Sequence, residues 1–127
     1  MEENQKLNIG IGSEKSASLE AKPVAIVGLD ITQKEFAGKQ TDQLVVMVKH
    51  PDKEEPFQMY SVAYQKGSSI KTVGFTLYYD SKGQLLQNTA PAELLRIYNV
   101  KVLNELVGKT IPTVLQLNKS YLALKAY

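Results

Sequence analysis

Residues 89–108 read TAPAELLRIYNVKVLNELVG, and this stretch decides how the rest of the chain is interpreted. Thr89 suits the start of a helix because its hydroxyl can accept a hydrogen bond from a free backbone N–H. Pro91 then falls in the first turn, where its missing N–H leaves no helical bond unmade. Asn99 tolerates a positive φ and therefore predicts the end of the first helix. The helical apolar pattern resumes after Asn99, and Gly108 predicts its end. The stretch therefore predicts two short helices joined by a kink.

Strand-like segments lie on both sides of this helical insert, which we place at residues 90–107. Apolar residues bounded by turn residues predict strands at 23–32, 43–49, 57–64, 70–80, 110–117 and 121–127. Gly28 in the first of these strands predicts a bulge or a sharp bend. The polar residues 33–42 are predicted to form a connection, and the last two strands are predicted to form a hairpin.

The order of these segments favours one fold class. Antiparallel strands in a chain of this size must hide their edges, and closure into a small barrel does so. Strands, then a helix, then two more strands is the order of the oligonucleotide/oligosaccharide-binding (OB) barrel. We therefore predict a mainly β fold with one helical block, a small OB-like antiparallel barrel over residues 21–127. An open α+β sheet with the helix on one face, or a sandwich, is the alternative.

The composition limits the chemistry that the chain can perform. Its 127 residues suit one domain, and the absence of Cys together with a single His excludes thiolate and multi-His metal sites. No run approaches the roughly 18 apolar residues that span a membrane, so no membrane association is expected. Residues 1–20 are polar and lack the apolar core of a signal peptide, which predicts a flexible tail on a cytoplasmic protein.

The net charge of +2 is unevenly distributed along the chain. Residues 1–20 carry four acidic and two basic side chains, a charge of −2, so residues 21–127 carry 13 basic and 9 acidic side chains, a charge of +4. A mildly basic domain with an acidic tail is compatible with binding a polyanion. A solvated surface of mixed charge explains the same numbers.

The sequence lacks the motifs of common enzymes. Residues 67–71, GSSIK, have neither the spacing nor the following helix of a phosphate-binding loop, and there is no Gly-x-Ser-x-Gly elbow. Three carboxylates in residues 52–55 lie near His50, but carboxylates are ordinarily exposed, which favours a solvated loop over a metal site. The sequence therefore predicts a binding protein that is not an enzyme and uses no cofactor.

Aromatic and basic residues gather in one part of the chain. Residues 57–79 hold six of the ten aromatic residues, with lysines in and beside them. Proteins that bind single strands without sequence preference combine a basic groove with aromatic faces on which bases stack. The candidate nucleic-acid-binding residues are Tyr60, Tyr64 and Tyr78 for base stacking, and Lys49, Lys66, Lys71 and Lys82 for phosphate contacts. Alternatively, each tyrosine packs in the core or on an ordinary strand face, and each lysine is an ordinary surface charge.

Alternation over residues 70–80 assigns neighbouring side chains to two faces of a strand. One face, predicted to pack in the core, carries Val73, Phe75, Leu77 and Tyr79. The opposite face, predicted to meet solvent, carries Thr72, Thr76 and Tyr78.

The end of the chain carries a family resemblance. Residues 101–127, KVLNELVGKTIPTVLQLNKSYLALKAY, contain Leu106, Gly108 and Lys109 in a Leu-x-Gly-Lys motif directly after the helical block. This part resembles the C-terminal part of small phage and archaeal-virus single-stranded-DNA-binding proteins, in which such a motif opens the final hairpin. The resemblance implies an OB-type barrel that binds single-stranded DNA during viral DNA replication in a host cytoplasm, with replication proteins as further partners.

Two functions from different classes follow from these observations. The first is binding of single-stranded DNA or RNA without strong sequence preference, through tyrosine stacking and lysine–phosphate contacts. The second is a structural or adaptor role, in which an exposed apolar edge at residues 44–48 or 121–127 binds another protein or forms a homo-oligomer. An enzyme is the least favoured interpretation.

Overall fold

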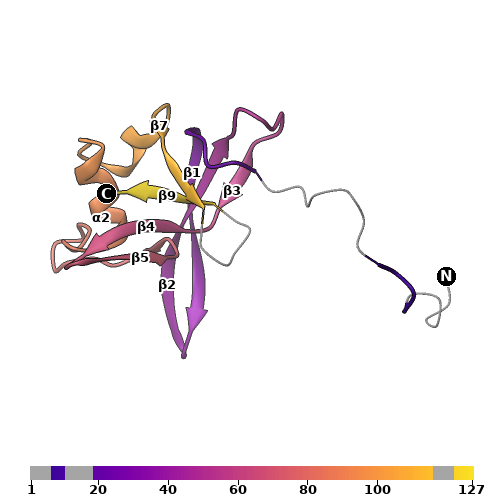
Figure 1. Ribbon diagram of the computed structural model, residues 1–127. Coiled ribbons are helices and arrows are strands. Elements are labelled where there is room, and N and C mark those ends of the chain that lie inside the picture. Colours follow the sequence, from indigo (N-terminus) through magenta and orange to yellow (C-terminus); the bar gives the residue numbers. More distant parts are fainter. Residues whose placement is uncertain (1–6, 11–18, 116–121) are drawn as a thin grey trace.

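The computed structural model describes residues 7–10, 19–115 and 122–127, and it is mainly β with a single α-helix among those residues (Figure 1). The strands are β1 (Val24–Phe36), β2 (Lys39–Lys49), β3 (Phe57–Met59), β4 (Val62–Lys66), β5 (Ser69–Val73), β6 (Thr76–Leu77), β7 (Thr110–Ile111), β8 (Thr113–Leu115) and β9 (Leu122–Ala126). The α-helix is α2 (Ala90–Ile97), and a short 3-10 helix, η1 (Leu103–Leu106), follows it.

The strands form two sheets that continue into each other. One sheet has the order β3-β2-β1-β7, with β6 also paired to β2, and the other has the order β5-β4-β9-β8. β3 leads into β4 across Tyr60 and Ser61, and β8 follows β7 across Pro112. The strands can therefore be followed from β1 through β2, β3, β4, β9, β8 and β7 back to β1. The first sheet curls strongly into a half-barrel, and the predicted OB-like fold class is confirmed.

One pairing corrects the prediction of an antiparallel barrel. β4 and β9 pair in parallel, with Val62 opposite Leu124 and Tyr64 opposite Ala126, whereas the other strand pairs are antiparallel. A parallel pair needs a long crossover connection, and the chain between these two strands includes β5, β6, α2, η1, β7 and β8. The last strand thereby joins segments that lie far apart in the sequence.

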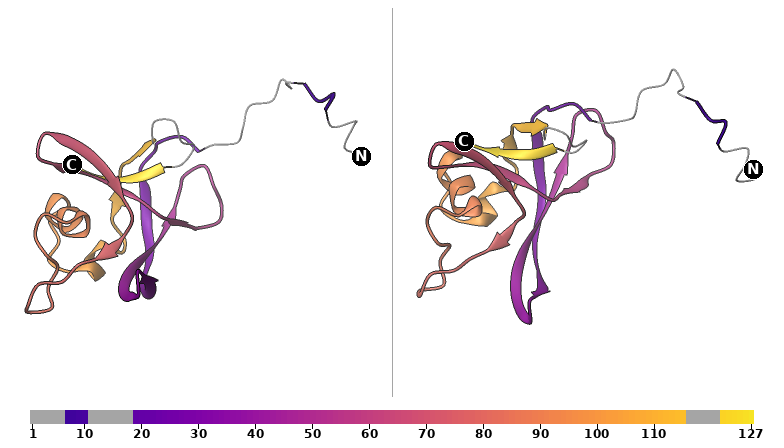
Figure 2. Two further views of the ribbon diagram at one scale, coloured as in Figure 1. Left: turned by 90° about the horizontal axis from the view of Figure 1, so that it is seen from below. Right: turned by 60° about the horizontal axis from the view of Figure 1, so that its bottom comes forward.

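The β1–β2 hairpin is longer than the sequence pattern predicts. Residues 33–42 are not a loose connection, because β1 and β2 stay paired from the barrel to the turn. Ala37 and Gly38 form that turn with φ angles of 52° and 77°, the left-handed pair that a tight hairpin requires. The hairpin extends beyond the barrel (Figures 1 and 2), so its outer half meets solvent, which explains its polar sequence.

Two predicted strands are each divided in the structure. Residues 57–64 divide at Tyr60 into β3 and β4, and residues 70–80 divide at Gly74 into β5 and β6. The β4–β5 hairpin leaves the first sheet at these two points, and β6 then returns to pair with β2. The local sequence does not encode this departure, because the apolar alternation continues across both breaks.

The helical block matches the prediction in outline. Asn99 and Gly108 have φ angles of 56° and 91°, which confirms the predicted stop and the predicted end of the block. The second helix is only a 3-10 turn, and the Thr89 hydroxyl donates to the Leu86 carbonyl at 2.7 Å instead of capping α2. α2 packs against β4 and β9 and buries Leu94 completely, which stabilises its attachment to the barrel.

The core lies between the curled sheet, the second sheet and α2. Its largest fully buried side chains include Phe75, Ile26, Leu94, Leu106, Ile111 and Leu124. They come from both sheets and from both helices, so the core joins all parts of the barrel. Two side chains predicted to face it do not: Val73 is 38% exposed and Tyr79 is 44% exposed, because β6 turns away from the β4–β5 hairpin between them.

Candidate nucleic-acid interface

Two neighbouring hollows mark the surface where the β4–β5 hairpin leaves the first sheet. The first, of about 470 Å³, is lined by β1, β2 and β3 and has Lys34 and Tyr60 in its wall. The second, of about 440 Å³, lies between the β4–β5 hairpin and the start of α2 and has Lys66 and Tyr78 in its wall. Gly74 lines both hollows, so they adjoin each other. We call the two hollows together the tyrosine groove.

Tyr60 and Tyr78 present their rings to solvent in this groove. Tyr60 is 72% exposed at the point where β3 gives way to β4. Tyr78 is 52% exposed and lies on the same side of its strand segment as Thr76. The side-chain amide of Gln43 donates to the Thr76 hydroxyl at 2.6 Å, which ties β6 to β2 and fixes the backbone that leads to Tyr78.

The β4–β5 hairpin brings a third predicted tyrosine and two predicted lysines to one face. Tyr64 lies opposite Lys71, and Lys66 lies opposite Ser69, so these side chains share a face of the hairpin. Tyr64 is only 7% exposed and belongs to the core, so too little of its ring is free for a base to stack on. Lys66 lines the groove directly, and Lys71 lies beside it on the exposed strand.

The other two predicted lysines lie away from the tyrosine groove. Lys49 is at the C-terminal end of β2, where its ammonium group donates to the carbonyls of His50, at 2.7 Å, and of Lys53. Lys82 lies in the turn that the Asp80 carboxylate closes by accepting hydrogen bonds from two backbone amides. Neither lysine lines either hollow, so the structure does not bring them together with the exposed tyrosines.

Lys34 is the basic groove residue that sequence reasoning missed. It lies on β1 in the outer half of the β1–β2 hairpin, in the segment whose polar sequence predicts a connection. The signal that could have found it is the Ala37–Gly38 pair. Glycine in a two-residue turn indicates a tight hairpin, which would place Lys34 on a strand with a defined face.

The groove lysines have no acidic partner among the residues that the structure describes. The ion pairs found there involve only Lys22 and Arg96. Arg96 donates to the Glu93 carboxylate through Nε at 2.9 Å, and this bond raises the pKa of Arg96. The positive charge of the groove therefore comes from two lining lysines, Lys34 and Lys66, and from Lys71 beside it on β5. None of the three pairs with a carboxylate among the described residues.

The loop after β2 does not form a metal site. His50 is fully buried, its Nδ1 accepts a hydrogen bond from the Asp52 amide at 3.0 Å, and its Nε2 donates to the Glu20 carbonyl at 2.8 Å. Both ring nitrogens are thus used within the protein. Lys22 lies 2.8 Å from the Asp52 carboxylate, and its hydrogen bond lowers the pKa of Asp52. Within the described ranges, no cluster of three or more His, Asp and Glu side chains could hold a metal ion.

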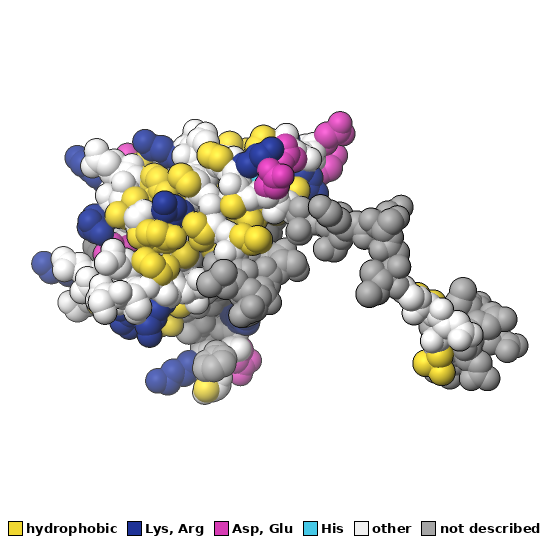
Figure 3. Space-filling view, in the orientation of Figure 1, with side chains coloured by type: hydrophobic (Ala, Val, Ile, Leu, Met, Phe, Trp, Pro, Cys, Tyr) yellow, Lys and Arg dark blue, Asp and Glu magenta, His cyan; other side chains and the backbone are white. Residues whose placement is uncertain are grey.

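A second surface feature is the outer face of the second sheet. Figure 3 shows hydrophobic side chains gathered on the face of the molecule that carries β4, β5 and β9, with lysines around them. Ile70 on β5 is 47% exposed and Tyr127 after β9 is 39% exposed. β5 and β8 are the end strands of this sheet, and β5 pairs only with β4. The edges predicted at residues 44–48 and 121–127 are wrong, because β2 and β9 each have partners on both sides, and Tyr121 lies outside the described residues.

The fold and the tyrosine groove together define the class of this protein: an OB-like, mainly β protein with a surface groove that is both aromatic and basic. No protein-family model, curated protein or solved structure matches the chain significantly. In the part of the chain that the structure describes, no helix is both long and apolar enough to cross a membrane.

Proposed function

We propose that this protein binds single-stranded nucleic acid in the tyrosine groove, without strong sequence preference. The observation that carries the proposal is the presence of two exposed rings, Tyr60 and Tyr78, in one groove. Bases stack on these two rings. The phosphates contact the three groove lysines, Lys34, Lys66 and Lys71. Such a combination of aromatic faces and positive charge is typical of proteins that bind single strands.

The position of the groove supports the proposal. OB barrels bind oligonucleotides on the face of their second and third strands. Here β2 is the second strand and the β3–β4 segment is the third, and the groove lies where these strands separate. OB barrels also use the loop between their last two strands, which here falls at residues 116–121 and lies outside the described residues.

Weak sequence preference follows from the side chains of the groove. Stacking tolerates every base because every base has a π-face. Arg96 is the one arginine of the chain, and it is held by Glu93 and lines neither hollow. The proposal covers DNA and RNA, and the resemblance of residues 101–127 favours DNA.

The test is a titration with a fluorescent oligo-dT, with a duplex of equal length as the control. We expect the single strand to bind more tightly than the duplex, and its affinity to fall with salt because phosphate contacts release counterions. Three lysine contacts correspond to a slope of about −2 in log K against log salt. A flat salt response, or equal binding of the duplex, contradicts the proposal. An RNA of the same length then separates DNA preference from RNA preference.

The apolar outer face of the second sheet favours a second candidate, the binding of another protein or of a second copy. Ile70 and Tyr127 supply exposed apolar area, and β5 supplies an unpaired strand edge. Lys71 lies in the middle of that edge, and a charge there opposes strand addition. Light scattering at low and high salt separates the candidates. A salt-independent oligomer without nucleic-acid affinity favours this second one.

A further inference from the structure

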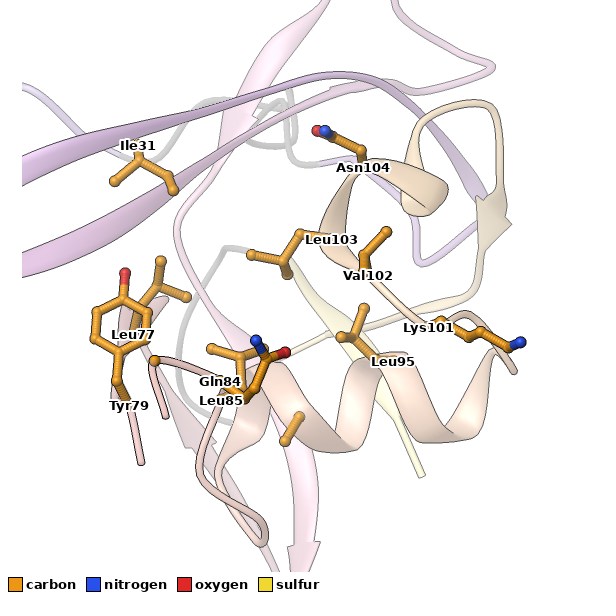
Figure 4. A pocket seen from close by; sticks show the side chains of 12 residues that line it. Ile31, Leu77, Tyr79, Gln84, Leu85, Leu95, Lys101, Val102, Leu103 and Asn104 are labelled. Atoms are coloured by element: carbon orange, nitrogen blue, oxygen red, sulfur yellow. The ribbon is translucent and has the colours of Figure 1, made fainter. Parts of the chain in front are cut away.

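A third hollow, of about 440 Å³, lies on the opposite side of the strand segment that carries Tyr78 (Figure 4). We call it the apolar pocket. Its walls come from the β1–β2 hairpin through Ile31, from the segment after β6 through Tyr79, from α2 through Leu95 and from η1 through Leu103. Its volume lies within the range of small-molecule sites, and its walls are mainly apolar with few polar groups, as in such sites.

The aromatic wall of this pocket is fixed in place. The Tyr79 hydroxyl donates to the Asp42 carboxylate at 2.6 Å, which links the segment after β6 to β2. Tyr79 also forms a β-bridge with Leu85, and the turn between them is closed by the Asp80 carboxylate, which accepts from the Gln84 amide at 3.0 Å. The ring of Tyr79 is nevertheless 44% exposed, so it offers a rigid flat surface to a ligand.

Two side-chain amides, of Gln84 and Asn104, stand at the edges of the apolar pocket (Figure 4). An amide carries both a donor and an acceptor, so it can pair with the edge of a heteroaromatic ring. Lys101 also lines the pocket, but its ammonium group points away from the centre. The pocket therefore combines apolar walls, one aromatic face and neutral polar edges, without a charge directed at its centre.

We propose that the apolar pocket binds one unpaired nucleobase. The base lies flat against Tyr79, Leu103 covers its other face, and the amides of Gln84 and Asn104 meet its polar edge. Tyr78 faces the tyrosine groove and the next residue, Tyr79, faces the apolar pocket. A nucleic-acid strand bound in the groove therefore lies close to the pocket. The base therefore comes either from that strand, in which case the inference rests on the proposed function, or from a free nucleoside.

The first experiment uses the free nucleoside, because it does not depend on strand binding. Adenosine is titrated against the full chain while the methyl resonances of Ile31, Leu95 and Leu103 are followed by NMR. We expect saturable shifts with a Kd on the order of 0.1 mM, from the usual affinity per atom of a ligand of this size. Tyr79→Leu should raise this Kd by about 5- to 150-fold, the range for loss of one base–aromatic stack. Tyr127→Leu, which changes an exposed tyrosine that lines none of the three hollows, should leave the Kd unchanged.

A second variant tests the pocket without removing any of its walls. Ala92→Leu, from α2, adds side-chain volume to the pocket and keeps a good helix former, so the fold is retained while the nucleoside is excluded. A raised Kd in Tyr79→Leu together with loss of the methyl shifts in Ala92→Leu supports the inference. Absence of shifts in the wild type, a wild-type Kd in folded Tyr79→Leu, or shifts that persist in folded Ala92→Leu overturns it.

The strand as the source of the base is tested with an oligo-dT that carries one 2-aminopurine. Quenching of its fluorescence that is lost in Ala92→Leu identifies a base from the strand in the apolar pocket. Quenching that is the same in the wild type and in this variant shows that the pocket takes no base from the strand. The two proposals fail separately. Salt-dependent oligonucleotide binding without nucleoside shifts leaves only the proposed function, and nucleoside shifts without oligonucleotide binding leave only the pocket.

Discussion

The two sides of the segment 76–79 differ in chemistry although they share one backbone. On one side, Thr76 and Tyr78 face the tyrosine groove, which is open and flanked by lysines. On the other side, Leu77 is 3% exposed and Tyr79 is held by Asp42, and both line the apolar pocket. The exposed area of a tyrosine is therefore a poor guide to its role. Tyr78 and Tyr79 differ by only eight percentage points in exposure, 52% against 44%, and yet face different surroundings.

The largest expected effect comes from the structural side of this segment. Leu77→Ala removes a buried side chain beside the apolar pocket and should lower the free energy of unfolding by about 2–5 kcal/mol. Urea denaturation measures the change. Thr76→Ala, on the groove side, is the control and should lose only the contribution of its hydrogen bond with Gln43, about 1 kcal/mol. Equal losses in the two variants would remove the distinction between the two sides.

The next effect concerns the groove side and leaves stability nearly unchanged. Tyr60→Ala and Tyr78→Ala should each weaken oligo-dT binding by about 1–3 kcal/mol, a 5- to 150-fold rise in Kd, because each loses one stacked base. Fluorescence anisotropy measures the Kd. Tyr127→Ala is the matched control, since Tyr127 is exposed on the second sheet beside Lys125 and away from both hollows. Wild-type affinity in a Tyr60→Ala/Tyr78→Ala double variant would contradict the proposed stacking.

A smaller effect separates Lys66 and Lys71, which share the groove-side face of the β4–β5 hairpin, from a lysine that lies elsewhere. Lys66→Gln and Lys71→Gln should each reduce the salt slope of log K by about 0.7, which corresponds to one lost phosphate contact on a single strand. Lys82→Gln changes the net charge equally but lies in a turn away from the groove, so its salt slope should stay near that of the wild type. The same slope in all three variants would mean that net charge, and not position, governs binding.

The smallest effect probes the hydrogen bond that fixes the pocket wall. The bond to Asp42 raises the pKa of Tyr79, so it stabilises the fold fully below the pKa of an ordinary tyrosine, about 10, and is lost as the pH rises through the raised value. Tyr79→Phe should therefore lower stability by well under about 1 kcal/mol at neutral pH, since the pair is largely solvent-exposed. The difference from the wild type should shrink in strongly alkaline urea titrations. Tyr78→Phe is the control, and a constant difference up to the highest pH would contradict the assignment.

Features set by single residues were predictable from the sequence. The register of β1 and β2 shifts between Ile26 and Gly28, which confirms the predicted bulge, and the positive φ angles of Asn99 and Gly108 confirm the ends of the helical block. These positions depend on backbone preferences that a short stretch of sequence carries by itself. The turn at Ala37 and Gly38 also depends on local backbone preference. The long β1–β2 hairpin could therefore have been predicted from these two residues.

The candidate site was only partly predictable. Tyr60, Lys66 and Tyr78 line the groove and Lys71 lies beside it, as the clustering of aromatic and basic residues indicates. Tyr64, in contrast, is buried in the core, and Lys49 and Lys82 lie elsewhere. The alternation of a strand gives the relative faces of its residues but not which face the core covers. Lys34 joined the groove from a hairpin whose strands the polar pattern does not reveal.

The sequence by itself determined the order of the elements, the mainly β class, the bulge and the helical ends, because each depends on local backbone preference and hydrophobic periodicity. Only the tertiary structure decided that β4 pairs in parallel with β9 and that the β4–β5 hairpin leaves the first sheet at Tyr60 and Gly74. The physical reason is that pairing and burial depend on partners distant in the chain. That departure of the hairpin leaves Tyr60 exposed and buries Tyr64, and the folded chain places Tyr78 at the tyrosine groove and Tyr79 at the apolar pocket.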